Sequence, residues 1–163
     1  MKTTMAIMNL EAKLSPVDSK ENVIMAIKEI FPNADIAEIT DKTSFPIHGK
    51  NEVIYIKDID YEFFFEKIHM NKIADTALDC MSQNIQNDIS YFKISRQAAL
   101  AGKIAFVLEN EYPLGGFFEL TVESTNIIAW IEEMTWHHGR DEIPRTVDDE
   151  LKMRRDGVPQ DWF

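Results

Sequence analysis

The sequence is poor in cysteine, in glycine and in long apolar runs, and each shortage excludes a class of structure. Cys80 is the only cysteine, so a disulfide within the chain and a four-cysteine zinc site are both excluded. The six glycines do not form the GxxxxGKS/T or GxGxxG loop that holds phosphate groups, which argues against nucleotide hydrolysis and dinucleotide binding. No apolar run approaches the roughly 18 residues that a membrane span needs. We therefore expect a cytoplasmic protein that has no membrane partner.

The common catalytic and metal-binding motifs are missing as well. GxSxG, HExxH and the calcium-binding EF-hand loop do not occur. His137 and His138 are adjacent, which turns their rings apart on a helix or a strand, so a shared metal ion would need a loop geometry and a distant carboxylate. Acidic pairs such as Glu132 with Glu133 fit solvated helix faces. The sequence therefore predicts a protein that is not an enzyme and that holds no metal and no small-molecule cofactor.

The charge of the chain is strongly acidic. Its 163 residues include 17 lysines and arginines against 28 aspartates and glutamates, which gives a net charge of -11. Such a charge repels polyanions at long range, so nucleic-acid binding needs a local cationic surface. The stretch from Ile89 to Leu108 contains no carboxylate but carries Lys93, Arg96 and Lys103. This stretch is the candidate surface for an anion.

The hydropathy pattern changes its period along the first third of the chain. Residues Ala6 to Leu14 alternate apolar and polar side chains, which predicts a half-buried strand. The next segment, "SPVDSKENVIMAIKEIFPNA", places its apolar residues on one helical stripe before the breaker Pro32, which predicts an amphipathic helix lying on a sheet. Two short strands are expected at Asp35 to Thr40 and at Glu52 to Lys57.

The middle of the chain predicts helix and then strand. Residues Tyr61 to Gln86 carry a helical apolar stripe, and Asn71 is the point at which this region can divide into two helices. A strand is expected from Ile89 to Ile94. The helical turn "SRQAALAG" follows, with Ser95 as its N-cap and Gly102 as its stop.

Two further strands and a helix are predicted in the last part of the core. The strands run from Lys103 to Glu109 and from Phe117 to Glu123, and the turn "NEYPLGG" lies between them. We expect them to pair as a hairpin with one wet face. The segment "NIIAWIEEM" then predicts a buried helix.

Together these elements predict an α+β fold in which helices pack on one face of a mostly antiparallel sheet. Residues 1–136 are expected to form a single core domain. Residues 137–163 form a C-terminal appendage, in which "TVDDELKMRRDG" has the capping and charge pattern of a short helix and "DWF" ends the chain with two aromatic residues. We expect this aromatic end to dock on its own domain or on a second copy.

The absence of carboxylates between Ile89 and Leu108 has two readings. Two buried strands joined by a tight helical turn would exclude carboxylates, because burying a charge is costly. In the second reading Lys93, Arg96 and Lys103 lie together at one edge, near a helix N-terminus that favours anions, and they bind an anion or a phosphate backbone.

Several motifs occur in a specific order between Met5 and Trp136. They read "IFPNADI", "KIADTALDCM", "SYFKISRQAALAGKIAF" and "YPLGGFFELTVES", and a helix with a tryptophan follows. In this order they resemble a small archaeal family of uncharacterised, predicted RNA-binding proteins. The chain departs from that family at Ser95, where the family has asparagine, and in the segment after Trp136.

The resemblance implies both a fold and a function. The implied fold is α+β and similar to that of a large-subunit ribosomal protein that binds a small ribosomal RNA. The implied function is RNA binding without an assigned catalytic activity. The basic and polar positions of the family fall on Lys93, Arg96, Gln97 and Lys103 of this chain.

Three hypotheses of function follow from these patterns. The first is a non-enzymatic RNA-binding protein that contacts the phosphate backbone through Lys93, Arg96, Gln97 and Lys103. The second is a protein-interaction or oligomerisation module that does not bind nucleic acid and that forms a homo-oligomer through a sheet edge or the aromatic tail. The third is an enzyme of unfamiliar type, whose mark would be a deep pocket lined by groups with perturbed pKa values.

Overall fold

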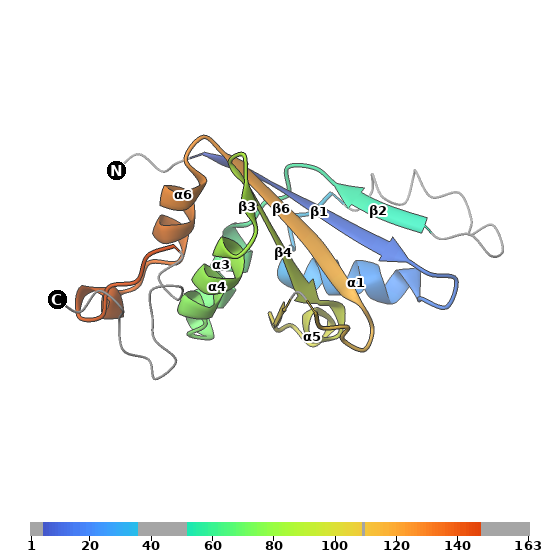
Figure 1. Cartoon of the computed structure of the whole chain (residues 1–163). Coiled ribbons are helices and arrows are strands. Elements are labelled where there is room, and N and C mark those ends of the chain that lie inside the picture. Colours follow the sequence, from blue (N-terminus) through green and yellow to red (C-terminus); the bar gives the residue numbers. More distant parts are fainter. Residues whose placement is uncertain (1–4, 36–51, 109, 148–163) are drawn as a thin grey trace.

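The computed structural model describes residues 5–35, 52–108 and 110–147 of the chain (Figure 1). In chain order its elements are β1 (Ala6–Leu14), α1 (Lys20–Ile30), β2 (Glu52–Ile56), α3 (Glu62–Met70), α4 (Ala74–Ser82), β3 (Ile85–Gln86), β4 (Ile89–Ser95), α5 (Arg96–Leu100), β5 (Phe106–Val107), β6 (Phe117–Ser124), α6 (Ile127–Met134) and the short 3-10 helix η1 (His138–Asp141).

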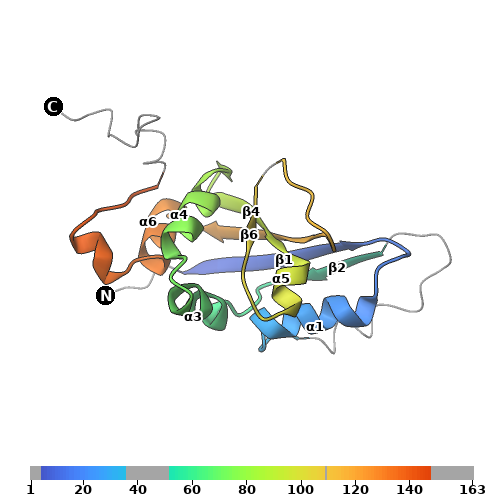
Figure 2. The same ribbon diagram turned by 90° about the horizontal axis from the view of Figure 1, so that it is seen from below.

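One antiparallel sheet organises these elements. Its strand order is β2-β1-β6-β4-β3, and the short β5 also pairs with β4. The helices α1, α3, α4 and α5 lie on one side of the sheet, as the view from below shows (Figure 2). On the opposite face, side chains such as Ile7, Val53 and Tyr55 are about half exposed, so no described helix lies over them. We call this face the open face. The predicted α+β fold with helices on one face is confirmed.

Alternation along the strands separates the covered face from the open face. In β1, Met8 and Leu10 are fully buried beneath the helices. Ile7, the residue before Met8, points to the open face and is half exposed. The register places Leu10 opposite Leu120 of β6 on one side and Ile56 of β2 on the other. Buried side chains therefore form continuous rows across the sheet, because successive residues of a strand point to opposite faces.

Aromatic rings fill the space between the sheet and the helices. Phe31 and Phe64 stack with their ring centroids 5.1 Å apart. Trp130 of α6 is fully buried and lies perpendicular to the rings of Tyr61 and Phe65, with centroid distances of 5.4 Å in both cases. Edge-to-face pairs of this kind add to the energy of burying the rings, and they fix α3 and α6 relative to each other.

The predicted helical region from Tyr61 to Gln86 divides into two helices at Asn71, as the sequence suggests. Lys72 has a left-handed backbone with φ of 57°. The N–H of Ile73 then donates to the carbonyl oxygen of Ile68 at 3.1 Å, which closes the end of α3.

The prediction that helix continues beyond Ser82 is wrong. The chain leaves α4 there and enters a β3–β4 hairpin that was not predicted. Its two turn residues, Asn87 and Asp88, both have positive φ, at 51° and 65°. A two-residue hairpin turn of type I′ needs positive φ at both positions, and Asn and Asp tolerate it better than other non-glycine residues.

The predicted hairpin between the two late strands is also wrong. β5 consists of two residues only, and it pairs with β4 through Lys93 opposite Val107. β6 lies between β1 and β4, where Leu120 faces Leu10 and Phe92. The alternation of β6 was read correctly, but the period of a strand does not specify which strand it pairs with, since packing of the whole buried face decides that.

Two predicted elements fall largely outside the described residues. Of the strand expected from Asp35 to Thr40, only the first residue is described. Of the expected helix in "TVDDELKMRRDG", only the first two residues are described. None of the helices in the described part of the chain has the length and apolar character that crossing a membrane requires.

The buried indole of Trp130 gives a test of the aromatic core. Trp130→Ala is expected to lower the free energy of unfolding by about 3 to 5 kcal/mol, because a large cavity is left. Among the described residues Nε1 of Trp130 has no hydrogen-bond partner, so Trp130→Phe loses no hydrogen bond and should cost only about 1 to 2 kcal/mol. Urea unfolding curves of both variants measure the difference. Equal losses for the two would contradict this account of the core.

Candidate functional site

The structure places the four predicted site residues on different sides of the sheet. Lys93 lies inside β4, and its side chain is on the open face opposite Glu119. Arg96 is the first residue of α5 and is buried. Gln97 is exposed beside the turn at Gly115. Lys103 is exposed just after α5, which packs against α1 on the covered side. The three cations therefore do not form one cationic edge.

Arg96 is a structural residue that joins three segments. Its Nε donates to the carbonyl oxygen of Phe117 at 2.9 Å, and its Nη2 donates to the carbonyl oxygen of Lys13. Its Nη1 lies 3.6 Å from the carboxylate of Asp18. The side chain is only 9% exposed, and burial lowers the pKa of its guanidinium although Asp18 and Glu119 act in the opposite direction. A group held in this way is not available to a phosphate.

The turn before β6 is shaped to admit this guanidinium. Gly116 has φ of 82°, and a Cβ added to it would lie 3.2 Å from Cζ of Arg96. A side chain at position 116 would therefore need both a rare backbone conformation and room that Arg96 already fills. We call the three contacts of Arg96 with Lys13, Phe117 and Asp18 the clamp. Just before Arg96 in the chain, the hydroxyl of Ser95 accepts a hydrogen bond from the N–H of Ala98 at 3.2 Å, which confirms Ser95 as the N-cap of α5.

Lys93 is the predicted cation that lies on the open face without a carboxylate partner. The neighbouring carboxylate of Glu119 accepts a hydrogen bond from the hydroxyl of Tyr91 at 2.8 Å and lies 3.7 Å from Nζ of Lys13. The ammonium of Lys93 instead lies 4.7 Å from the ring centroid of Phe117. Among the described residues it forms no ion pair. Lys93 therefore keeps its charge available to a ligand.

Tyr91 is fixed beside Lys93 as a neutral hydrogen-bond donor. Burial raises the pKa of its phenol far above the usual range, and the carboxylates of Glu119 and Glu11 raise it further. The phenol therefore stays protonated, and its bond to Glu119 holds the ring in one orientation.

A cavity of about 410 Å³ lies beside Tyr91 and Lys93, along the edge of β4 that β3 and β5 leave partly uncovered. We call it the β4-edge cavity. It contains no carboxylate among its lining residues, in a chain where carboxylates greatly outnumber cations. Its lining residues are Cys80, Gln83, Asn84, Gln86, Asn87, Ile89, Tyr91, Phe92, Lys93 and Val107.

The residues that sequence reasoning missed are the four carboxamides of this cavity. They come from the end of α4 and from the β3–β4 hairpin, which the sequence analysis had assigned to a continuing helix. The signal was present as "SQNIQN", in which four of six residues are amides. Part of the acid-free stretch, by contrast, is explained by burial, because Phe92, Ile94 and Ala99 belong to the core.

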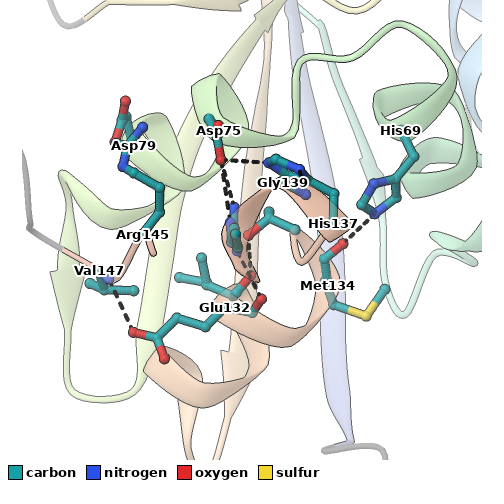
Figure 3. Close-up of polar contacts among 12 residues, drawn as sticks. His69, Asp75, Asp79, Glu132, Met134, His137, Gly139, Arg145 and Val147 are labelled. Carbon is teal, nitrogen blue, oxygen red and sulfur yellow. Dashed lines mark hydrogen bonds and ion pairs between the residues drawn. The ribbon is translucent and has the colours of Figure 1, made fainter. Parts of the chain in front are cut away.

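A second polar cluster joins the first described part of the appendage to α4 (Figure 3). The carboxylate of Asp75 accepts from Nε2 of His137 at 3.0 Å and from Nη2 of Arg140 at 3.1 Å. Nδ1 of His137 accepts from the N–H of Gly139 at 3.2 Å, so the proton of a neutral imidazole is on Nε2. The buried Arg140 also donates to the carbonyl oxygen of Glu132 at 3.1 Å.

Two more contacts of this cluster attach residues 137–147 to the helices α4 and α6. Arg145 pairs with Asp79, and the N–H of Val147 donates to the carboxylate of Glu132 at 3.0 Å. Every group in the cluster is thus matched within the protein, and across the described ranges no group of three or more His, Cys, Asp or Glu side chains is arranged to hold a metal ion. The cluster fixes residues 137–147 on α4 and α6.

Comparisons with known proteins agree on the fold. No family model matches the chain. It is similar in sequence to a UPF0201 protein of Sulfurisphaera tokodaii, with 26% identity over 130 residues, which cover 77% of this chain and 84% of that protein.

Solved structures support the same relation. A UPF0201 protein from Methanococcus jannaschii has a TM-score of 0.64 at 20% identity, over 81% of this chain and 100% of that one. Mth689, a DUF54 protein from Methanothermobacter thermautotrophicus, has a TM-score of 0.50 at 14% identity, over 87% and 97% of the two chains. The chain therefore shares the fold of the UPF0201 and DUF54 proteins.

The clamp made by Arg96 predicts a large effect on stability. Arg96→Met keeps the apolar stem but leaves the carbonyls of Lys13 and Phe117 without their donor, and it is expected to lower the free energy of unfolding by about 3 kcal/mol. The neighbouring exposed Gln97→Ala should change it by no more than about 0.5 kcal/mol. Chemical denaturation measures both. A normal unfolding midpoint for Arg96→Met would show that the clamp is dispensable.

The docked segment should detach in acid. Burial acts to raise the pKa of Asp75, but hydrogen bonds from His137 and Arg140 together with their charges lower it below the ordinary value of 3.8. A lowered pKa means that the stabilisation is present above the unfolded value and is lost as the pH falls through the folded one. NMR signals of residues 137–147, followed during acidification below about pH 4, should show this loss.

Asp75→Asn tests the assignment of this transition. The variant cannot titrate at position 75, so its acid transition should disappear, whereas Asp141→Asn in the same segment, which is exposed, should keep it. An unchanged transition in the Asp75 variant would assign the docking to other groups.

Proposed function

We propose that the protein belongs with the archaeal UPF0201 proteins and binds RNA without catalysing a reaction. One observation carries the proposal: the unpaired ammonium of Lys93 lies on the open face at the rim of a cavity that contains no carboxylate. A phosphate of a single strand can reach Lys93 from solvent, since neither a helix nor an ion pair in the described part of the chain blocks it.

The chemistry around Lys93 suits a single strand better than a duplex. Proteins that bind single-stranded nucleic acid combine a cation for the backbone with aromatic rings against the bases. Here the ammonium of Lys93 lies against the ring of Phe117. Tyr91 precedes Lys93 by two residues in β4 and lies on the same face of the sheet. The sheet offers no long row of cations, because Glu11, Glu119 and Glu123 occupy neighbouring positions on the open face.

The acidity of the chain limits the number of phosphate contacts and thereby predicts a weak dependence on salt. Each phosphate contact with a single strand contributes about -0.7 to the slope of log affinity against log salt. With Arg96 buried and Lys103 on the other side of the molecule, few contacts are available near Lys93. Affinity must then come largely from the bases.

The sequence likeness to a UPF0201 protein supports the family part of this proposal. The resemblance of the motifs to archaeal predicted RNA-binding proteins supports the RNA-binding part. The same proposal includes a fold similar to that of a large-subunit ribosomal protein, as the resemblance implies. An antiparallel sheet with one uncovered face provides a surface on which a single strand can lie.

A second candidate function is a protein-interaction module. The observation that favours it is the exposure of Ile7, Val53 and Tyr55, at 49%, 52% and 50%, on the open face. Exposed apolar side chains on an uncovered sheet face are common in interfaces. This candidate predicts a stable oligomer or complex that forms without nucleic acid.

Lys93→Ala separates the two functions. Loss of one phosphate contact is expected to weaken the binding of single-stranded RNA about fivefold and to reduce the magnitude of the salt slope by about 0.7. The matched control is Lys28→Ala, which removes the same charge from the exposed side of α1 and should leave binding unchanged. Fluorescence anisotropy of a labelled RNA at several salt concentrations measures both variants.

The RNA proposal fails if no binding is detected even near about 50 mM salt, where backbone contacts are strongest. It also fails if Lys28→Ala and Lys93→Ala weaken binding equally, because the effect is then one of total charge. Light scattering of the RNA-free chain over a range of concentrations then decides for or against self-association.

A further inference from the structure

The β4-edge cavity presents hydrogen-bonding groups that the protein itself does not use. Gln83, Asn84, Gln86 and Asn87 line it, and each carboxamide offers two N–H donors and one carbonyl acceptor. Within the described residues none of these four side chains hydrogen-bonds to another residue. Their donors and acceptors are therefore free for a ligand that has both kinds of group along one edge.

Less polar groups from both faces of the β4 edge form the rest of the cavity wall. Tyr91, Phe92, Ile89 and Val107 contribute rings and aliphatic groups. The ring of Tyr91 is held by its hydrogen bond to Glu119, so it is a fixed surface. A planar ligand with a polar edge fits such a wall, because its face can stack while its edge meets the carboxamides.

The cavity is held open by the fold on two sides. The hydroxyl of Ser90, which is fully buried, donates to the carbonyl oxygen of Met81 at 2.5 Å and ties β4 to the end of α4. The two-residue turn at Asn87 and Asp88 fixes the β3–β4 hairpin opposite. A volume of about 410 Å³ falls in the lower part of the range of about 300 to 1,000 Å³ that is usual for small-molecule sites.

Charge distinguishes this cavity from two others on the described surface. The cavity beside α1 includes Asp18, and the cavity near α3 includes Asp58, Asp60 and Glu62. In the first of these Asp18 is paired with Arg96, which leaves no free cation for an anion, and the three carboxylates of the second repel one. The β4-edge cavity has Lys93 as its one ionised lining residue, so a ligand with a phosphate is attracted to it.

We propose that the β4-edge cavity binds one unstacked nucleobase, with the carboxamides on the polar edge of the base, Tyr91 against its ring and the attached phosphate at Lys93. This inference rests on the proposed RNA function, in which the base belongs to a single strand. A free nucleotide carries the same chemistry, so the two sources must be separated by experiment.

Cys80 provides a direct reporter of occupancy. It lines the cavity and is the only cysteine of the chain, so a thiol reagent modifies one position. Saturating mononucleotide is expected to slow this modification at least about threefold, whereas ribose 5-phosphate and inorganic phosphate, which lack the base, should not. The same ligands are then compared with single-stranded RNA oligomers.

The double variant Gln83→Leu with Gln86→Leu removes two carboxamides while keeping side-chain size. Both residues are exposed, so the fold should be preserved. Affinity for mononucleotide and for RNA should fall about tenfold, with little change in the salt slope. Asn71→Leu removes an exposed carboxamide at the α3–α4 turn, away from the cavity, and should have no effect.

The outcomes separate this inference from the proposed function. If RNA binds with Lys93 dependence but neither the double variant nor mononucleotide matters, the cavity proposal is overturned and RNA binding stands. If mononucleotide protects Cys80 and RNA does not bind, the cavity is a nucleotide site and the RNA proposal is overturned. If nothing binds, both fail.

Discussion

The hydrogen bonds of the Arg96 guanidinium hold together the end of the sheet on which the candidate site depends. They join a carbonyl at the end of β1 to a carbonyl at the start of β6, and the charge is balanced by Asp18 before α1. The same residue begins α5, so β4 is anchored where it leaves the sheet. Alternation along β4 turns its odd-numbered residues, including Lys93, to the open face.

A buried arginine of this kind has one consequence for the charge of the chain. Burying a guanidinium is costly unless its donors are used, and here backbone carbonyls and one carboxylate use them. The cation is thereby paired with Asp18 and removed from the surface, so it leaves the net charge of the chain unchanged but offers no positive charge to a ligand. Of the cavities described above, only the β4-edge cavity has no carboxylate in its lining, which makes it the most favourable of them for an anionic ligand.

Sequence periodicity predicted most of the fold because burial acts through it directly. β1 has the predicted bounds, and the amphipathic pattern located α1 and α6. The N-cap at Ser95 and the break at Asn71 follow from local backbone chemistry, which short motifs encode. The partner of β6 was predicted wrongly, because strand pairing depends on residues far apart in the sequence that a single strand does not specify.

The site was less predictable than the fold for a related reason. A sequence shows that Lys93, Arg96 and Lys103 are close along the chain, but β4 and α5 turn their side chains in different directions. Conversely, the amides near Gln83 join Lys93 only because β3 folds back on β4 through a turn at Asn87 and Asp88. The charge pattern pointed to β4, and the hairpin that completes the cavity beside it is a tertiary feature that no charge pattern records.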